Sequence, residues 1–262
     1  MWLSLVITLL GGPGPIDPER ETSVAGACAA WTGVRAADGP ATHWVGPDGL
    51  CFSGDITAEN SATFVQALAG VDPTIPLVVV VTSDGGEINA GMSMGEVLVP
   101  LTTTVVAQRI CASSCANYLF TAGDRRVIDD DALLLFHGGA HPLNEAELRK
   151  AIAPQVRADQ LEAQVAAIVA DVQVQIQRQD AFSERAGIDV DFFRWMAGFN
   201  ALSEEDFLAL CPVRDPVMIA YSDRLLAMQG VVVHENRGPQ SQEDMTRAVA
   251  ALGRTEAVCY MD

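Results

Sequence analysis

Residues 77–82 read LVVVVT and are followed at once by SDGG at 83–86. An unbroken β-branched run bounded by a turn is typical of a strand buried on both faces of a parallel sheet. Around this strand, segments with the apolar spacing of a helix alternate with short β-branched segments typical of strands. It predicts helices at about 58–71, 90–98 and 113–122, and strands at 102–107, 126–128 and 132–136. This alternation predicts βαβ crossovers and an α/β fold.

A long helical pattern follows over about 144–185, with an interruption at Pro154. Its apolar residues recur at helical spacing and predict a packing face, which can include a subunit interface. They are Leu161, Val165, Ile168, Val169, Val172 and Ile176. A short helix is expected at 189–196. We therefore divide the chain into a signal or anchor segment (1–23), an irregular lead-in (24–51), one α/β domain (52–229) and a C-terminal tail (230–262).

The charge balance restricts the partners of the chain. Its 262 residues include 34 acidic and 16 basic side chains, a net charge of -18, and Lys150 is the single lysine. Such a surface repels phosphate, which argues against nucleic acid and anionic lipid as partners. A chain of this length buries enough surface to fold without a metal or a disulfide.

The N-terminal residues 2–10, WLSLVITLL, are apolar. Nine residues are too few for a membrane-spanning helix, and the length suits the core of a signal peptide. No Lys or Arg precedes them, so a truncated signal, an anchor and an ordinary first strand remain alternatives. We expect export, to the periplasm or beyond, with the cytoplasm as the alternative. Membrane association is expected only through this segment.

The six cysteines are even in number, which permits disulfides in an exported chain, although buried thiols are the alternative. Cys28 and Cys51 bracket a Gly/Pro-rich loop and are the favoured pair. The remaining cysteines are left unassigned. Cys111 and Cys115 are too sparse for a zinc site, so neither a metal nor another cofactor is expected.

Three segments carry candidate chemistry. The glycines of the 83–86 loop let the backbone approach a ligand closely at a helix N-terminus. Residues 111–116, CASSCA, place serine between a strand and a helix, where a hydroxyl can enter the crevice and the next N–H can bind an oxyanion. Ser113 or Ser114 can equally be a helix N-cap. His137 follows a strand, where open α/β sheets place functional groups.

Together these segments resemble the ClpP serine peptidases of the ClpP/crotonase superfamily. Residues 83–93, SDGGEINAGMS, resemble the family's glycine loop, and 112–123, ASSCANYLFTAG, its nucleophile helix. Phe136-His137 resembles its Ile-His pair, and the LSEE of 202–205 a later Leu-Ser segment. The paired cysteines around a serine resemble exported bacterial ClpP-like proteins. The resemblance implies a ClpP/crotonase-like spiral of βαβ units with a long helix in the C-terminal half.

Residue by residue, the resemblance implies a serine nucleophile at Ser114, which lies nine residues before Gly123. It implies His137 as general base, because a serine hydroxyl needs an imidazole to accept its proton. The N–H groups of Gly86 and Cys115 would form the oxyanion hole. Substrate binding is implied at Gly85, Glu87 and Ile88.

The third member of the triad departs from the family pattern. The family's aspartate position falls on Phe199 or Asn200, and an asparagine can orient an imidazole without stabilising its charge. Asp189 and Asp191 are the alternatives. Ser113 also competes with Ser114, since a shift of one residue would exchange them. Ala116 stands where the family has glycine.

The function expected from the resemblance is a serine endopeptidase or related acyl hydrolase that acts on peptide or protein and forms homo-oligomers. One alternative is a catalytically inactive member of the fold that binds peptide or a partner. Another is a crotonase-type enzyme acting on an acyl thioester, against which the acidic composition argues. A serine–lysine dyad would need Lys150, which lies in a helical, solvent-facing stretch, and is discounted.

Overall fold

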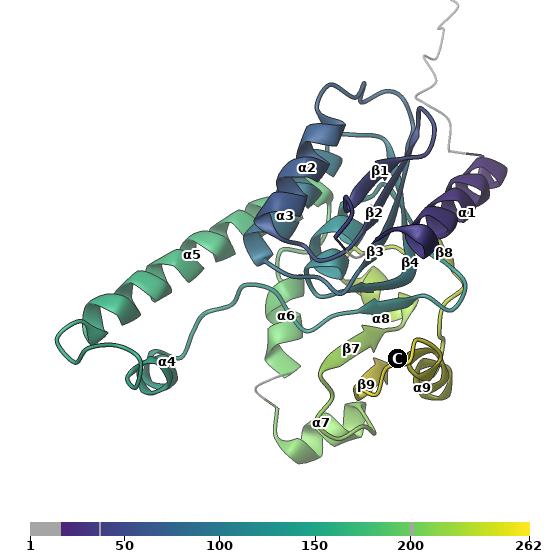
Figure 1. Cartoon of the computed structure of the whole chain (residues 1–262). Coiled ribbons are helices and arrows are strands. Elements are labelled where there is room, and N and C mark those ends of the chain that lie inside the picture. Colours follow the sequence, from purple (N-terminus) through teal and green to yellow (C-terminus); the bar gives the residue numbers. More distant parts are fainter. Residues whose placement is uncertain (1–16, 37, 200–201) are drawn as a thin grey trace, which may run out of the picture.

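A computed structural model describes residues 17–36, 38–199 and 202–262 of the chain. Its main sheet has seven strands in the order β1-β2-β3-β4-β5-β8, and β6 pairs with β4 (Figure 1). Only the β1–β2 pair is antiparallel. The predicted α/β class is therefore confirmed. The strands are β1 (Thr42–Trp44), β2 (Gly49–Ser53), β3 (Leu77–Ser83), β4 (Thr103–Ala112), β5 (Arg125–Ile128), β6 (Leu133–Leu135) and β8 (Glu235–Asn236).

Strand β3 is buried on both faces, as the apolar run predicts. Val79 and Val81 belong to the main core, whereas Val78 and Val80 belong to a second cluster on the opposite face. Helices α2, α3 and η1 lie on the first side of the sheet and α1 on the second (Figure 1). These helices are α1 (Pro18–Val34), α2 (Ala58–Leu68), α3 (Ile88–Leu98) and the π-helix η1 (Cys115–Phe120).

Strand β4 is longer than predicted because it pairs with two partners in succession. Its first half pairs with β5, and residues from Ile110 onward pair with β6. Between the halves, Arg109 adopts a positive φ of 58°, and the register of β4 against β3 shifts nearby. The carboxyl ends of β4 and β6 therefore lie side by side, as neighbouring parallel strands require.

The predicted irregular lead-in is ordered. Residues 24–36 and 38–51 lie within α1, β1, β2 and their connections, and the disulfide between Cys28 and Cys51 joins α1 to β2. That predicted pairing is confirmed. Helix α1 begins inside the predicted 1–23 segment, at Pro18, behind an Asp17 N-cap. The signal-like residues 2–10 lie outside the described part of the chain.

The long helical pattern forms two helices, α4 (Glu145–Ile152) and α5 (Leu161–Ala186), separated near Pro154. Helix α5 extends away from the sheet and carries α4 at its far end (Figure 1). Of the predicted apolar face, Val165 and Ile176 are buried. The next helix is α6 (Phe192–Gly198). No helix in the described ranges is both long and apolar enough to cross a membrane.

Residues 230–262, predicted as a tail, are folded onto the domain. Strand β8 extends the main sheet beside β5, and β7 (Met218–Tyr221) pairs in parallel with β9 (Val258–Met261). A disulfide joins Cys211 to Cys259. Helix α9 (Gln242–Ala251) lies between β8 and β9, and α7 (Glu204–Leu210) and α8 (Asp223–Met228) precede this region.

Candidate active site

Ser113 and His137 meet where β4 and β6 end. The Ser113 Oγ lies 2.6 Å from His137 Nε2. The two residues are neighbours because the Ser113 N–H donates to Leu135 O, in the strand that leads to His137, at 2.9 Å. When Nε2 is unprotonated, the hydroxyl donates to it, which is the contact a general base needs to activate a nucleophile.

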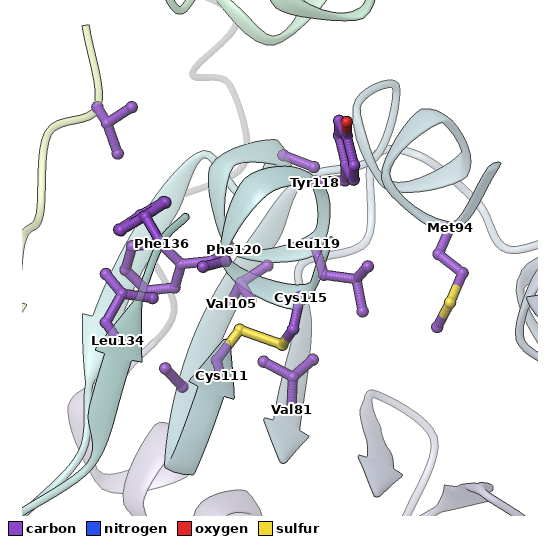
Figure 2. Close-up of a cluster of buried hydrophobic side chains, with 14 of the residues drawn as sticks. Val81, Met94, Val105, Cys111, Cys115, Tyr118, Leu119, Phe120, Leu134 and Phe136 are labelled. Carbon is purple, nitrogen blue, oxygen red and sulfur yellow. A yellow bond between two sulfur atoms is a disulfide. The ribbon is translucent and has the colours of Figure 1, made fainter. Parts of the chain in front are cut away.

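Ser113 sits at a strained junction between β4 and η1. Its φ of 56° lies in the left-handed region that residues with a Cβ rarely adopt. Such conformations persist only where the surroundings enforce them, and they concentrate at functional sites. A disulfide between Cys111 and Cys115 spans the junction (Figure 2). Ser113 is midway between the two cysteines in sequence.

The structure places Ser114 away from the histidine. Its hydroxyl donates to Gly86 O at 2.8 Å, and its side chain is buried. Counting back from Gly123 gives Ser114, whereas the serine in contact with His137 is Ser113. The reason is the helix between them: η1 is π-helical, and an i→i+5 turn contains one more residue than an α-helical turn.

The glycine turn packs directly on this junction. Gly85 has φ 97°, and a Cβ on it would lie 2.6 Å from both Ala112 O and the Ser113 Cβ. Only glycine permits that approach. Gly86 has φ 147° and is exposed, and its N–H donates no hydrogen bond within the described residues.

The backbone N–H groups that lie free beside Ser113 among the described residues differ in part from the predicted pair. The N–H that directly follows Ser113 belongs to Ser114, and it also donates to no described protein atom. Cys115, predicted for this role, is one residue further and takes part in the disulfide. Gly86 and Ser114 thus supply two free backbone donors at the site. The predicted neighbours Glu87 and Ile88 begin α3, with Glu87 exposed and Ile88 partly exposed.

The backbone around His137 is fixed on both sides. Phe136 exchanges two backbone hydrogen bonds with Ile219 of β7, each 2.7 Å long. After the histidine, Asn117 Nδ2 donates to Gly138 O at 2.7 Å, and Gln179 of α5 bonds to both the N–H and the C=O of Ala140. Sequence reasoning missed Asn117 and Gln179. The signal available was an amide side chain on the apolar face of a predicted helix.

No described side chain hydrogen-bonds to the second ring nitrogen of His137. Asn200, the predicted third member, lies outside the described residues. The Asp189 carboxylate accepts from the Asp191 N–H, and Asp191 pairs with Arg194. These two aspartates are therefore engaged elsewhere. Among the described residues, no cluster of three or more His, Cys, Asp or Glu could hold a metal ion.

The site is open to solvent rather than enclosed. His137, Gly86 and Glu87 are exposed, and Ser113 is 9% exposed. A cavity of about 440 Å³ lies instead against α1 and β4, where Glu21 and Gln108 contribute to its lining. An open site of this kind suits an extended substrate laid across the surface better than a small molecule held in a pocket.

One surface ion pair ties the glycine turn to the C-terminal region. Arg254, which follows α9, pairs with Asp84 of the turn and with Glu256.

No protein-family model matches this sequence, and no curated protein is significantly similar to it.

Proposed function

We propose that this protein is a serine hydrolase of the ClpP/crotonase type that cleaves peptide bonds. The contact between Ser113 and His137 carries the proposal. It has the geometry of a nucleophile and its general base, at the carboxyl ends of adjacent parallel strands. The glycine turn beside it and the βαβ succession of β2 to β6 support the fold type.

In the proposed reaction, His137 Nε2 accepts the hydroxyl proton as Ser113 Oγ attacks the scissile carbonyl. The Gly86 and Ser114 N–H groups stabilise the resulting oxyanion, each contributing about 3 kcal/mol. His137 then donates the proton to the leaving amine, which leaves an acyl group on Ser113. A water molecule activated by His137 hydrolyses this ester and regenerates the serine.

Peptide is favoured over an acyl thioester of a nucleotide carrier. The chain has a net charge of -18, and Glu87 stands exposed beside the Gly86 donor. Both features disfavour a polyanionic carrier. The three disulfides of the described chain support an oxidising compartment, and so export, as part of the proposal.

A second candidate function is peptide or partner binding without catalysis. The observation that favours it is the missing hydrogen bond to the second nitrogen of His137 within the described residues. Loss of the charged third member from a Ser-His-Asp triad lowers kcat by about 10⁴-fold. A site with only two aligned members is therefore expected to turn over slowly at best.

The test is covalent labelling with a fluorophosphonate probe, located by peptide mass mapping. The proposal expects label on Ser113 that Ser113→Ala abolishes and His137→Ala reduces. Ser114→Ala is the matched control and should retain the label. Label on Ser114 would contradict the assignment, and no label on folded protein would favour the binding function. Incubation of labelling-competent protein with a peptide library and with an acyl thioester then separates the substrate classes.

A further inference from the structure

The disulfide Cys111–Cys115 encloses the candidate nucleophile. Ser113 is two residues from each cysteine, and the Cα atoms of the two cysteines are 5.2 Å apart. We propose that this disulfide positions Ser113 for reaction, by holding the strand-to-helix junction in its strained conformation. The inference rests on the proposed function, and it assigns to Cys111 and Cys115 the role of positioning residues.

The first argument is geometric. Four residues of continuing strand would span about 13 Å, whereas the disulfide closes the same stretch to 5.2 Å. The chain must therefore double back at Ser113, where φ is 56°. A positive φ at a residue with a Cβ is unfavourable and needs external constraint. The covalent closure supplies it on both sides of the serine.

The second argument compares the three disulfides. A cross-link stabilises a fold chiefly by restricting the unfolded chain, and that effect grows with the length of the closed loop. Cys111 and Cys115 are four residues apart in sequence, against 23 for Cys28–Cys51 and 48 for Cys211–Cys259. The short closure contributes least to global stability. Its position around Ser113 is better explained by local geometry.

The third argument is burial. Cys111 and Cys115 are both fully buried in the main core, and Figure 2 shows Val81 and Val105 beside the disulfide. The disulfide is thereby packed as rigidly as the core itself. Because the Cα atoms of Cys111 and Cys115 are held in place, the backbone of Ser113 between them is held as well. A buried disulfide is also poorly accessible to reductants, and substitution is the appropriate way to remove it.

The experiment measures the rate constant (kinact) and the binding constant (KI) of fluorophosphonate labelling at Ser113. The Cys111→Ala/Cys115→Ala variant is compared with Cys28→Ala/Cys51→Ala, which removes a longer closure away from the site. Misplacement of a reacting group by about 1 Å can cost about 100-fold in rate. We expect a loss of this order in kinact with KI unchanged in the first variant, and wild-type kinact per folded molecule in the second.

The inference is overturned if the first variant labels as fast as the wild type, or if both variants lose label only in proportion to their unfolded fraction. Absence of label on the wild type would overturn the proposed function, and this inference with it. If the first variant does not fold, Cys111→Ala/Cys115→Val, which restores part of the buried apolar volume, gives the same comparison. Labelling of this variant at the wild-type kinact per folded molecule would likewise overturn the inference.

Discussion

The Tyr118 hydroxyl donates a hydrogen bond of 2.8 Å to Gln179 Oε1, and both side chains are buried. Burial raises the pKa of Tyr118, so the hydroxyl remains a donor at any physiological pH. The same Gln179 amide accepts from the Ala140 N–H and donates to the Ala140 C=O. One side chain thus joins η1, α5 and the segment after His137.

Replacement of Gln179 by alanine should therefore cost more than an ordinary hydrogen bond. It leaves the Tyr118 hydroxyl and both backbone groups of Ala140 without their hydrogen-bond partner, and each unpaired buried group costs about 1–3 kcal/mol. We expect a loss of about 3 kcal/mol in the free energy of unfolding from urea denaturation. Tyr118→Phe is the matched control at about 1 kcal/mol, because Ala140 still satisfies Gln179. Equal losses in the two variants would show that the Ala140 bonds contribute little.

Gly85→Ala should damage the site through contact as well as strain. The added Cβ would lie 2.6 Å from Ala112 O and from the Ser113 Cβ, at a φ of 97°. We expect a loss of about 3 kcal/mol in stability together with slower labelling of Ser113. Gly70→Ala separates the two causes, since Gly70 has φ 85° but nothing within 4 Å of its new Cβ. It should lose about 1 kcal/mol and label normally. A normal labelling rate in Gly85→Ala would contradict the close packing.

Removal of the Arg254 side chain should have a small effect on stability. Its ion pairs with Asp84 and Glu256 lie at the surface, and exposed pairs contribute about 0–1 kcal/mol. We expect Arg254→Ala to lower the free energy of unfolding by less than about 1 kcal/mol, and high salt to reduce the difference between variant and wild type. A larger, salt-independent loss would mean that the arginine acts through packing instead.

Stability should fall with acidification through the histidine range. Burial and the nearby Arg126 and Arg125 lower the pKa of His234 from its usual 6.5, and its Nδ1 accepts from the Arg126 N–H at 3.1 Å. The folded protein therefore binds a proton less readily than the unfolded chain. This contribution is complete above the unfolded pKa of about 6.5 and is lost as pH falls through the folded value.

The test for His234 compares the free energy of unfolding of wild type and His234→Asn between about pH 8 and pH 5. The difference between the two should shrink or change sign as pH falls, because asparagine does not titrate. The effect should be small, since His234 is exposed and solvent screens its neighbours. A difference that stays constant with pH would contradict the assignment of His234 as the titrating group.

The central fold could be predicted because its signals are local. The β-branched run of β3 predicts a buried strand from residue type alone, and the spacing of apolar residues predicts the helix that becomes α2. The lead-in and the C-terminal region lack such signals. Strand β8 is only two residues long, and β9 exists because β7 is beside it, so neither can be recognised from its own sequence.

The position of the Ser113–His137 contact was predictable to within one residue. His137 and the glycine turn follow from their positions at the ends of buried strands. The exchange of Ser113 for Ser114 arose because a π-helical turn absorbs an extra residue without any gap in the sequence. Hydrogen-bond spacing within a helix is not encoded in residue type. The roles of Asn117 and Gln179 depend on long-range contacts with backbone atoms, which sequence patterns do not reveal.

The pairing of Asp84 with Arg254 also sets an order of events during synthesis. Asp84 and the adjoining Gly85 leave the ribosome 170 residues before Arg254, and Cys211 emerges 48 residues before Cys259. Strands β2 to β6 can associate while translation continues. Arg254 can pair with Asp84, and Cys259 can bond to Cys211, only after these strands have been made. A nascent chain therefore lacks the Asp84–Arg254 ion pair and the Cys211–Cys259 disulfide until its last residues have been made.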